Sequence, residues 1–122
     1  MRKLQKRKPQ NQRRSSIPEK IMNFGGSEVV YDYDRSGIII VPVPYDGTST
    51  WMKGSDKGPE AVMQASVNLE FYDVETGTEV HKRGIHTISP VTEDSSPGAL
   101  VDAVCKKIKS LLAENKFPVT VG

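Results

Sequence analysis

The chain has 122 residues, which is enough for one modest domain. Its hydrophobic and charged shares, 36% and 26%, are those of a globular protein, and no apolar run approaches the roughly 20 residues that span a bilayer. The single cysteine, Cys105, excludes an internal disulfide and a zinc site of several cysteines, and it favours a reducing, cytoplasmic setting. The net charge of +2 is unevenly placed, because seven of the 17 basic residues and none of the acidic ones lie in residues 1–16.

Residues 1–16 therefore form a basic arm ahead of a mildly acidic body, residues 17–122. The arm is nearly free of apolar side chains, so we expect a disordered tail. It lacks the apolar core of a secretory signal, which argues against export. A nucleic-acid contact, an anionic-membrane contact and an organellar presequence are open readings of the arm. We favour a plain solvated tail, since no aromatic residue is interleaved to stack on bases.

The first regular element is predicted as a β-strand over residues 38–43, after a loop-rich lead-in. Its residues are β-branched and continuously apolar, as in a parallel strand that is covered on both faces, and Pro42 should loosen its end. A glycine-rich loop, residues 45–57, comes next. A helix is then predicted to open at Gly58, because the proline that follows suits a first turn. Four apolar residues lie at helical spacing along it: Ala61, Val62, Ala65 and Leu69.

Two further strands are predicted over residues 84–88 and 117–121, with the clearest helix signal between them. Ser96 can cap this helix, Pro97 fits its first turn, and Asn115 is a plausible end. The predicted buried stripe, on which the thiol would be inert, comprises Val101, Val104, Cys105, Ile108 and Leu111. The order strand–helix–strand–helix–strand predicts an α/β fold, as a partial three-layer α/β/α arrangement with a parallel sheet and right-handed crossovers.

The loop after the first strand lies between a predicted strand and a predicted helix, where a phosphate-binding loop would lie. It fails the Walker A pattern, because Met52 stands where a glycine should precede Lys53 and no serine or threonine follows that lysine. The dinucleotide pattern GxGxxG is also missing from the sequence. Nucleotide binding is therefore not expected.

Acidic and histidine residues gather in one stretch, at Asp73, Glu75, Glu79 and His81. Their spacing matches no known ligand set, so we interpret the stretch as a solvated connecting loop. His86 lies in the short second strand and is interpreted as a structural residue. Taken alone, these side chains do not make an active site.

Taken in order, residues 23–122 resemble the N-terminal third of the arginase/agmatinase (ureohydrolase) family. The matching pieces are residues 23–26 (NFGG), 39–50 (IIVPVPYDGTST), 57–62 (KGPEAV), 69–76 (LEFYDVET), 84–85 (GI) and 117–122 (FPVTVG). Each piece is weak, but the set in this order is fairly specific, and it looks more like bacterial agmatinase than arginase. One departure concerns a P-G-x-R-x-G-P loop found in many agmatinases, which reads MKGSDKGP here. The loop here has lysines and no arginine, and lysine keeps a charge but loses the bidentate fork, which leaves the substrate open.

The resemblance implies a fragment of a manganese-dependent hydrolase that converts agmatine to putrescine and urea in polyamine synthesis, and a homo-oligomer, commonly a trimer or hexamer. In the family, the strand ending in V-G runs into a G-G-[DE]-H segment with the first metal-binding histidine, and D-x-H-x-D and D-x-D segments supply the other ligands. Two manganese ions activate water for attack on the guanidinium carbon. Gly122 matches at best the first glycine of that segment. We therefore expect the domain to be incomplete at its C-terminus, with none of these ligands in this chain and no activity of the chain alone.

The loop after the first strand is the candidate substrate loop. In open α/β sheets, ligands bind beyond the carboxyl ends of the strands, which places residues 46–56 on the active-site side. As a rim or lid, the loop would offer Asp46, Thr48, Ser49 and Trp51. A purely structural turn is an equally open reading.

Two other functions remain open at this point. One is a related guanidino hydrolase of the arginase or guanidinobutyrase type. The other is a non-catalytic α/β interaction module whose basic arm binds nucleic acid, with an affinity that falls steeply with salt.

Overall fold

The computed structural model describes residues 22–29 and 31–122, so the predicted basic arm lies outside the described residues. The elements, in chain order, are β1 (Ile38–Pro42), the short 3-10 helix η1 (Ser55–Lys57), α1 (Gly58–Ser66), the short 3-10 helix η2 (Val80–Arg83), β2 (Ile85–Thr87), α2 (Pro97–Ala113) and β3 (Phe117–Val121). No helix among the described residues is long and apolar enough to cross a membrane. The predicted order of strands and helices is confirmed.

The three strands form one parallel sheet in the order β2-β1-β3. In the register, Ile38 of β1 stands opposite Ile85 of β2 on one side and Phe117 of β3 on the other. The first predicted strand is therefore the central one, as its continuous apolar run indicated. It ends at Pro42, in keeping with the missing N–H of proline.

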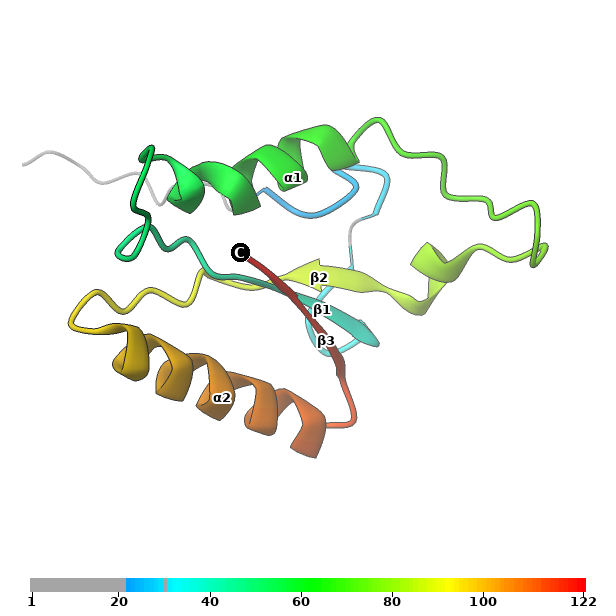
Figure 1. Ribbon diagram of the computed structural model, residues 1–122. Coiled ribbons are helices and arrows are strands. Elements are labelled where there is room, and N and C mark those ends of the chain that lie inside the picture. Colours follow the sequence, from blue (N-terminus) through cyan, green and yellow to red (C-terminus); the bar gives the residue numbers. More distant parts are fainter. Residues whose placement is uncertain (1–21, 30) are drawn as a thin grey trace, which may run out of the picture.

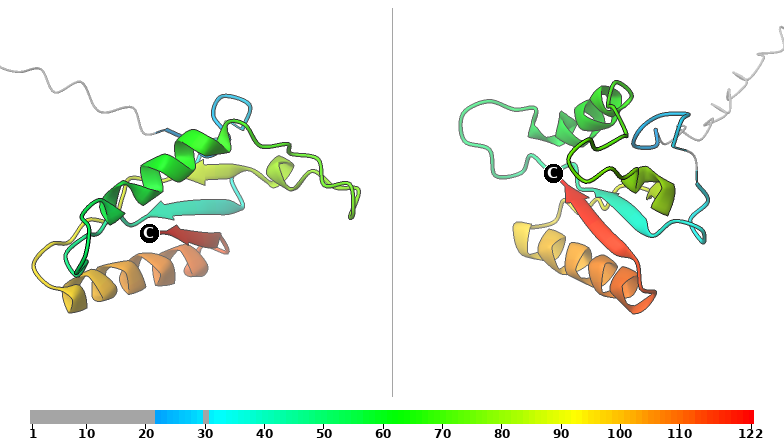
Figure 2. Two further views of the ribbon diagram at one scale, coloured as in Figure 1. Left: turned by 45° about the horizontal axis from the view of Figure 1, so that its top comes forward. Right: turned by 90° about the vertical axis from the view of Figure 1, so that its right-hand side faces the viewer.

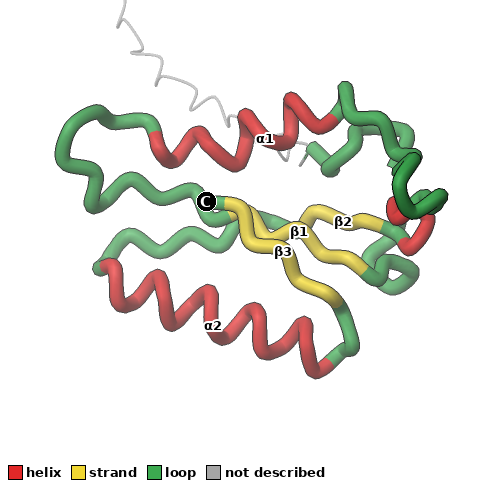
Figure 3. The backbone as a smooth tube through the Cα atoms, turned by 45° about the vertical axis from the view of Figure 1, so that its right-hand side comes forward, coloured by secondary structure: helices red, strands yellow, loops and turns green. Residues whose placement is uncertain are grey.

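The sheet is the middle of three layers, with α1 on one face and α2 on the other (Figures 1 and 2). Both helices run back along the strands (Figure 3), as expected for crossovers between parallel strands. The predicted α/β class and the α/β/α layering are confirmed.

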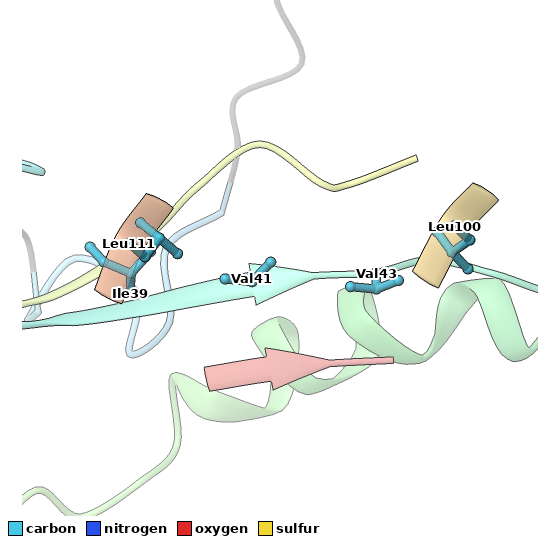
Figure 4. Packing of buried hydrophobic residues seen from close by; sticks show 5 residues of the cluster. All are labelled: Ile39, Val41, Val43, Leu100 and Leu111. Carbon is cyan, nitrogen blue, oxygen red and sulfur yellow. The ribbon is translucent and has the colours of Figure 1, made fainter. Parts of the chain in front are cut away.

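Successive residues of β1 serve two different cores, because side chains alternate across a strand. Ile39, Val41 and Val43 pack with Leu100 and Leu111 of α2, and all five are buried. Figure 4 shows Leu111 over Ile39 and Leu100 beside Val43, as expected for a helix antiparallel to the strand. The other core gathers on the α1 side of the sheet and comprises Val29, Ile40, Met63 and Ile85.

α1 begins at Gly58 as predicted, and its buried face does not include the four apolar residues noted at helical spacing. Met63 and Ser66 are buried, and the Ser66 hydroxyl is satisfied, since it donates to the Met63 carbonyl oxygen (2.6 Å) and accepts from the Gly25 N–H (2.9 Å). A satisfied hydroxyl can face the core, which hydropathy alone does not indicate. Those four residues are exposed, and the last of them lies beyond the helix end: Ala61, Val62, Ala65 and Leu69.

α2 has the predicted cap, in which the Ser96 hydroxyl oxygen accepts from the Ala99 N–H at 3.1 Å. Asn115, in the left-handed region at φ 56°, follows its end. The buried stripe was predicted partly wrongly, because Val101 is 65% exposed and Cys105 is exposed. The residues that pack on the sheet are Leu100, Val104, Ile108 and Leu111. The Cys105 thiol is therefore not a buried one.

Candidate functional site

The carboxyl ends of β1 and β3 and the start of α1 meet at one edge of the sheet. Just past the paired strands, the Val43 N–H donates to the Val121 carbonyl oxygen at 2.7 Å. At the start of α1, a methyl group built on Gly58 would lie 3.4 Å from the Gly122 carbonyl oxygen, so the two backbones are in contact. The loop between β1 and α1 leaves from this edge and returns to it, on the side where β3 ends (Figure 3). Ligands of open α/β sheets bind beyond the carboxyl ends of the strands, so this is the end of the sheet at which ligand binding is expected.

Asp46 holds the two limbs of this loop together. Its carboxylate accepts a hydrogen bond from the Ser49 hydroxyl and one from the Gly54 N–H (2.7 Å). Its backbone carbonyl oxygen accepts from the Lys53 ammonium at 2.8 Å, and that ammonium also reaches the Ser49 carbonyl oxygen at 3.5 Å. The Ser49 hydroxyl, and after it the Gly54 N–H, hold the pKa of the Asp46 carboxyl below its usual range. We call these four residues the loop brace: Asp46, Ser49, Lys53 and Gly54.

Two of the brace residues were not predicted as part of the site. Lys53 was noted only as the lysine of a failed phosphate loop, and its ammonium instead lies against loop carbonyls. Gly54 has φ 127°, a conformation that side chains disfavour, and this lets the chain turn back so that its N–H reaches Asp46. The sequence signal, an aspartate followed three residues later by serine, is typical of side-chain-stabilised turns and indicates the Asp46–Ser49 bond but neither Lys53 nor Gly54.

The other two predicted site residues lie at the outer part of the loop. Trp51 is 91% exposed and Thr48 is exposed, as is Met52 at the same tip. The four candidates thus separate into two that organise the loop, Asp46 and Ser49, and two that face outward, Thr48 and Trp51.

The acidic stretch at the other end of the sheet, between α1 and β2, is built from local turns. Asp73 accepts from the Thr76 hydroxyl (2.8 Å) and the Glu75 N–H (2.9 Å), which together lower the pKa of its carboxyl, with the hydroxyl as the larger cause. Glu79 forms an ion pair with Lys82. Within residues 22–29 and 31–122, no three His, Cys, Asp or Glu side chains gather to hold a metal ion. The described residues therefore do not fit the manganese pair that the family resemblance implies.

A shallow depression lies beside this stretch. Its walls are Glu28, Val67, Asn68, Leu69, Glu70, Phe71, Tyr72, Glu79 and His81. The His81 and Phe71 rings lie 5.0 Å apart between centroids. All of these residues except Glu28 belong to the segment between α1 and β2, which lies at the opposite end of the sheet from the loop between β1 and α1 (Figure 1).

His86 makes the contacts of a structural residue. Its Nδ1 lies 2.9 Å from the Tyr31 carbonyl oxygen, and because a carbonyl only accepts, Nδ1 is the donor. Its ring stands edge-on to that of Tyr33, at 5.9 Å between centroids. These contacts attach the lead-in segment to β2.

Comparisons with known proteins cover most of the chain. A model of the arginase family matches residues 36–122. The N(1)-aminopropylagmatine ureohydrolase of Synechocystis sp. is 38% identical over 105 residues, which are 81% of this chain and 34% of that protein. The protein of the same name from Thermus thermophilus is 37% identical over 68 residues, which are 56% of this chain and 22% of that protein.

A solved structure has the same fold. The crystal structure of agmatine ureohydrolase of Thermoplasma volcanium superimposes with a TM-score of 0.71 and 22% sequence identity, over 82% of this chain and 33% of that one. The chain thus spans about a third of the length of the Synechocystis and Thermoplasma proteins. On the family match and the Synechocystis identity together, the chain belongs to the arginase family of ureohydrolases.

Proposed function

We propose that the complete protein is a ureohydrolase that acts on a linear guanidino amine of the agmatine type. Water adds to the guanidinium carbon, the bond from that carbon to the alkyl-bearing nitrogen breaks, and urea leaves together with a primary amine. Membership of the arginase family is the observation that carries this proposal. The braced loop at the carboxyl edge of the sheet supports it, because that edge is where an α/β sheet binds its ligands.

For the substrate, we propose N1-aminopropylagmatine first and agmatine second. The relatives from Synechocystis and Thermus bear the name N(1)-aminopropylagmatine ureohydrolase, at 38% and 37% identity. Agmatine is supported by the resemblance of the loop sequence to bacterial agmatinases and by the name of the structural neighbour. Arginine and guanidinobutyrate are the weaker candidates.

We also propose that the complete enzyme requires two manganese ions, as the family resemblance implies. The described residues of this chain provide no ligand group for them. We therefore assign the ligands to parts of the complete protein outside this sequence, and assign to this chain the loop that borders the substrate site. We further propose that the complete protein is cytoplasmic, which the single cysteine supports. The family resemblance supports a homo-oligomer, a trimer or a hexamer.

The test is urea release by the protein expressed from its complete reading frame. Agmatine, N1-aminopropylagmatine, arginine and guanidinobutyrate are compared, with manganese added and with manganese removed by a chelator. We expect manganese-dependent urea from the two agmatine-type substrates, with the higher kcat/KM for N1-aminopropylagmatine. Urea from arginine or guanidinobutyrate alone would replace the substrate assignment, and no urea from any of the four would refute the enzyme.

The non-catalytic alternative depends on the basic arm, which lies outside the described residues. It predicts nucleic-acid affinity that falls steeply with salt. A binding titration at two salt concentrations, made on the same protein, decides it. Absent or salt-insensitive binding removes this alternative.

A further inference from the structure

Trp51 is the most exposed of the large hydrophobic side chains in the described part of the chain, at 91%. It is also the only tryptophan of the sequence. A tryptophan carries the largest apolar surface of any side chain, and it is usually well buried. A single exposed apolar residue is ordinary, so its significance depends on how the chain holds it.

The chain holds Trp51 on an ordered base. Two residues before it, Ser49 donates to Asp46, and three residues after it the Gly54 N–H donates to the same carboxylate. Lys53 adds its bond to the Asp46 carbonyl oxygen. Both limbs of the loop are therefore fixed on either side of the tip. A fixed base reduces the ordering that a contact at the tip would otherwise require.

The position of the loop indicates what such a contact would meet. The loop stands at the edge where β1 and β3 end and α1 begins. A linear guanidino amine that places its guanidinium at this edge extends its other, protonated amine end outward. The rim of the site would then border the aminoalkyl chain and not the reacting carbon.

We propose that Trp51 is a specificity-determining residue whose indole face binds the cationic aminoalkyl chain of the substrate. This inference rests on the proposed function. Tryptophan has the most favourable ring face for an ammonium group, and the methylene groups of a polyamine add apolar contact. A substrate longer by an aminopropyl group offers the rim an additional charged nitrogen. Trp51 therefore favours N1-aminopropylagmatine over agmatine.

The neighbouring side chains do not fit this role. The carboxylate of Asp46 and the hydroxyl of Ser49 are engaged within the loop. Met52 is also exposed, at 72%, but a thioether has no ring face for a cation. Met52 therefore provides a matched control, of similar exposure and at the adjacent position.

The experiment compares Trp51→Ala, Trp51→Phe and Met52→Ala with the wild type in the complete manganese-loaded protein. KM and kcat for urea release are measured with N1-aminopropylagmatine and with agmatine. We expect Trp51→Ala to raise KM for the longer substrate by about 3- to 30-fold. The rise for agmatine should be smaller, and kcat should be unchanged, because a rim contact binds ground state and transition state alike. Trp51→Phe should restore most of the affinity, and Met52→Ala should change KM by less than about twofold.

Fluorescence gives a second readout that a merely structural role would not move. The longer substrate should change the tryptophan emission of the wild type, and this change should be smaller in Trp51→Phe by the contribution of Trp51. An active enzyme whose KM is unaltered in Trp51→Ala, or rises equally for both substrates or equally in Met52→Ala, would overturn the role of Trp51 and leave the proposed function standing. A wild type that releases no urea from any guanidino substrate would overturn both.

Discussion

β2 is an outer strand of the sheet, and the side chain of Asn23 makes hydrogen bonds to the backbone groups on its outer side. Replacing Asn23 with alanine tests how much these bonds stabilise the fold. The side-chain oxygen of Asn23, Oδ1, accepts from the Thr87 N–H at 2.7 Å. Its amide nitrogen donates to the Ile85 carbonyl oxygen at 3.1 Å and to that of Val29. The side-chain amide therefore pairs with β2 as one peptide group of a neighbouring strand would.

The expected loss follows from counting the bonds that the amide can make at once. Its nitrogen has two hydrogens and its oxygen accepts from Thr87, so three hydrogen bonds are counted even though a third carbonyl, that of Phe24, lies 3.3 Å from the nitrogen. At a net value of about 1 kcal/mol each, Asn23→Ala should lower the free energy of unfolding by about 3 kcal/mol. Asn68→Ala is the matched control, because this exposed amide makes one long bond of 3.5 Å, and it should change stability by less than about 0.5 kcal/mol.

Two measurements check this prediction. Urea unfolding followed by circular dichroism gives the overall loss, and hydrogen exchange reports the Thr87 amide itself. If the edge opens locally, protection of that amide should fall on the order of 100-fold in Asn23→Ala and remain unchanged in Asn68→Ala. Unaltered protection of the Thr87 amide, together with a loss below about 1 kcal/mol, would refute the reasoning by showing that water replaces the side chain at little expense.

Three further predictions concern the core, the thiol and the loop brace. Leu111→Ala should lower the free energy of unfolding by about 2–5 kcal/mol in urea denaturation, since that side chain is 2% exposed, whereas Leu112→Ala, at 55% exposure, should have a small effect. Cys105, which is exposed, should react in the native protein with a thiol reagent about as fast as in the unfolded one; strong protection would contradict its position on α2. Because hydrogen bonds lower the pKa of Asp46 from 3.8, its stabilisation of the loop is fully present above pH 3.8 and is lost as the pH falls through the lowered value. Trp51 emission should change in that acid range and not in Asp46→Asn; a change centred near neutral pH would contradict the assignment.

The central strand was predictable because burial on both faces of the sheet requires an apolar residue at every position. A strand covered by helices on both faces must be apolar at consecutive positions, and residues 38–41 are three isoleucines and a valine. The helix faces were less predictable. On α2, Val101 and Leu112 are as apolar as Leu100 and Leu111, so the apolar arc is wider than the stripe that the sheet covers. Periodicity defines such an arc, and only the packing selects its buried centre.

For the candidate site, too, one property was predictable from the sequence and another was not. Its location follows from the rule that ligands bind at the carboxyl ends of strands, and the loop does lie at that edge. The separate roles within the loop could not be predicted, because they depend on where the chain returns. Asp46 accepts from Gly54, eight positions on, only because the glycine turn brings the second limb back. Such a bond is a property of the folded loop and leaves no short pattern in the sequence.

The two edges of the sheet differ in a way that bears on the proposed function. The β2 edge is closed by Asn23, whereas β3 has β1 as its only strand neighbour in the described part of the chain, and Phe117 is 67% exposed there. An unpaired strand edge can add another strand, and the Synechocystis and Thermoplasma proteins are about three times as long as the part that this chain matches. A parallel strand added beside β3 would place its carboxyl end next to that of β3, at the end of the sheet from which the loop of Asp46 leaves. Under the proposed function, this open edge is the side on which further substrate contacts would join the loop that carries Trp51.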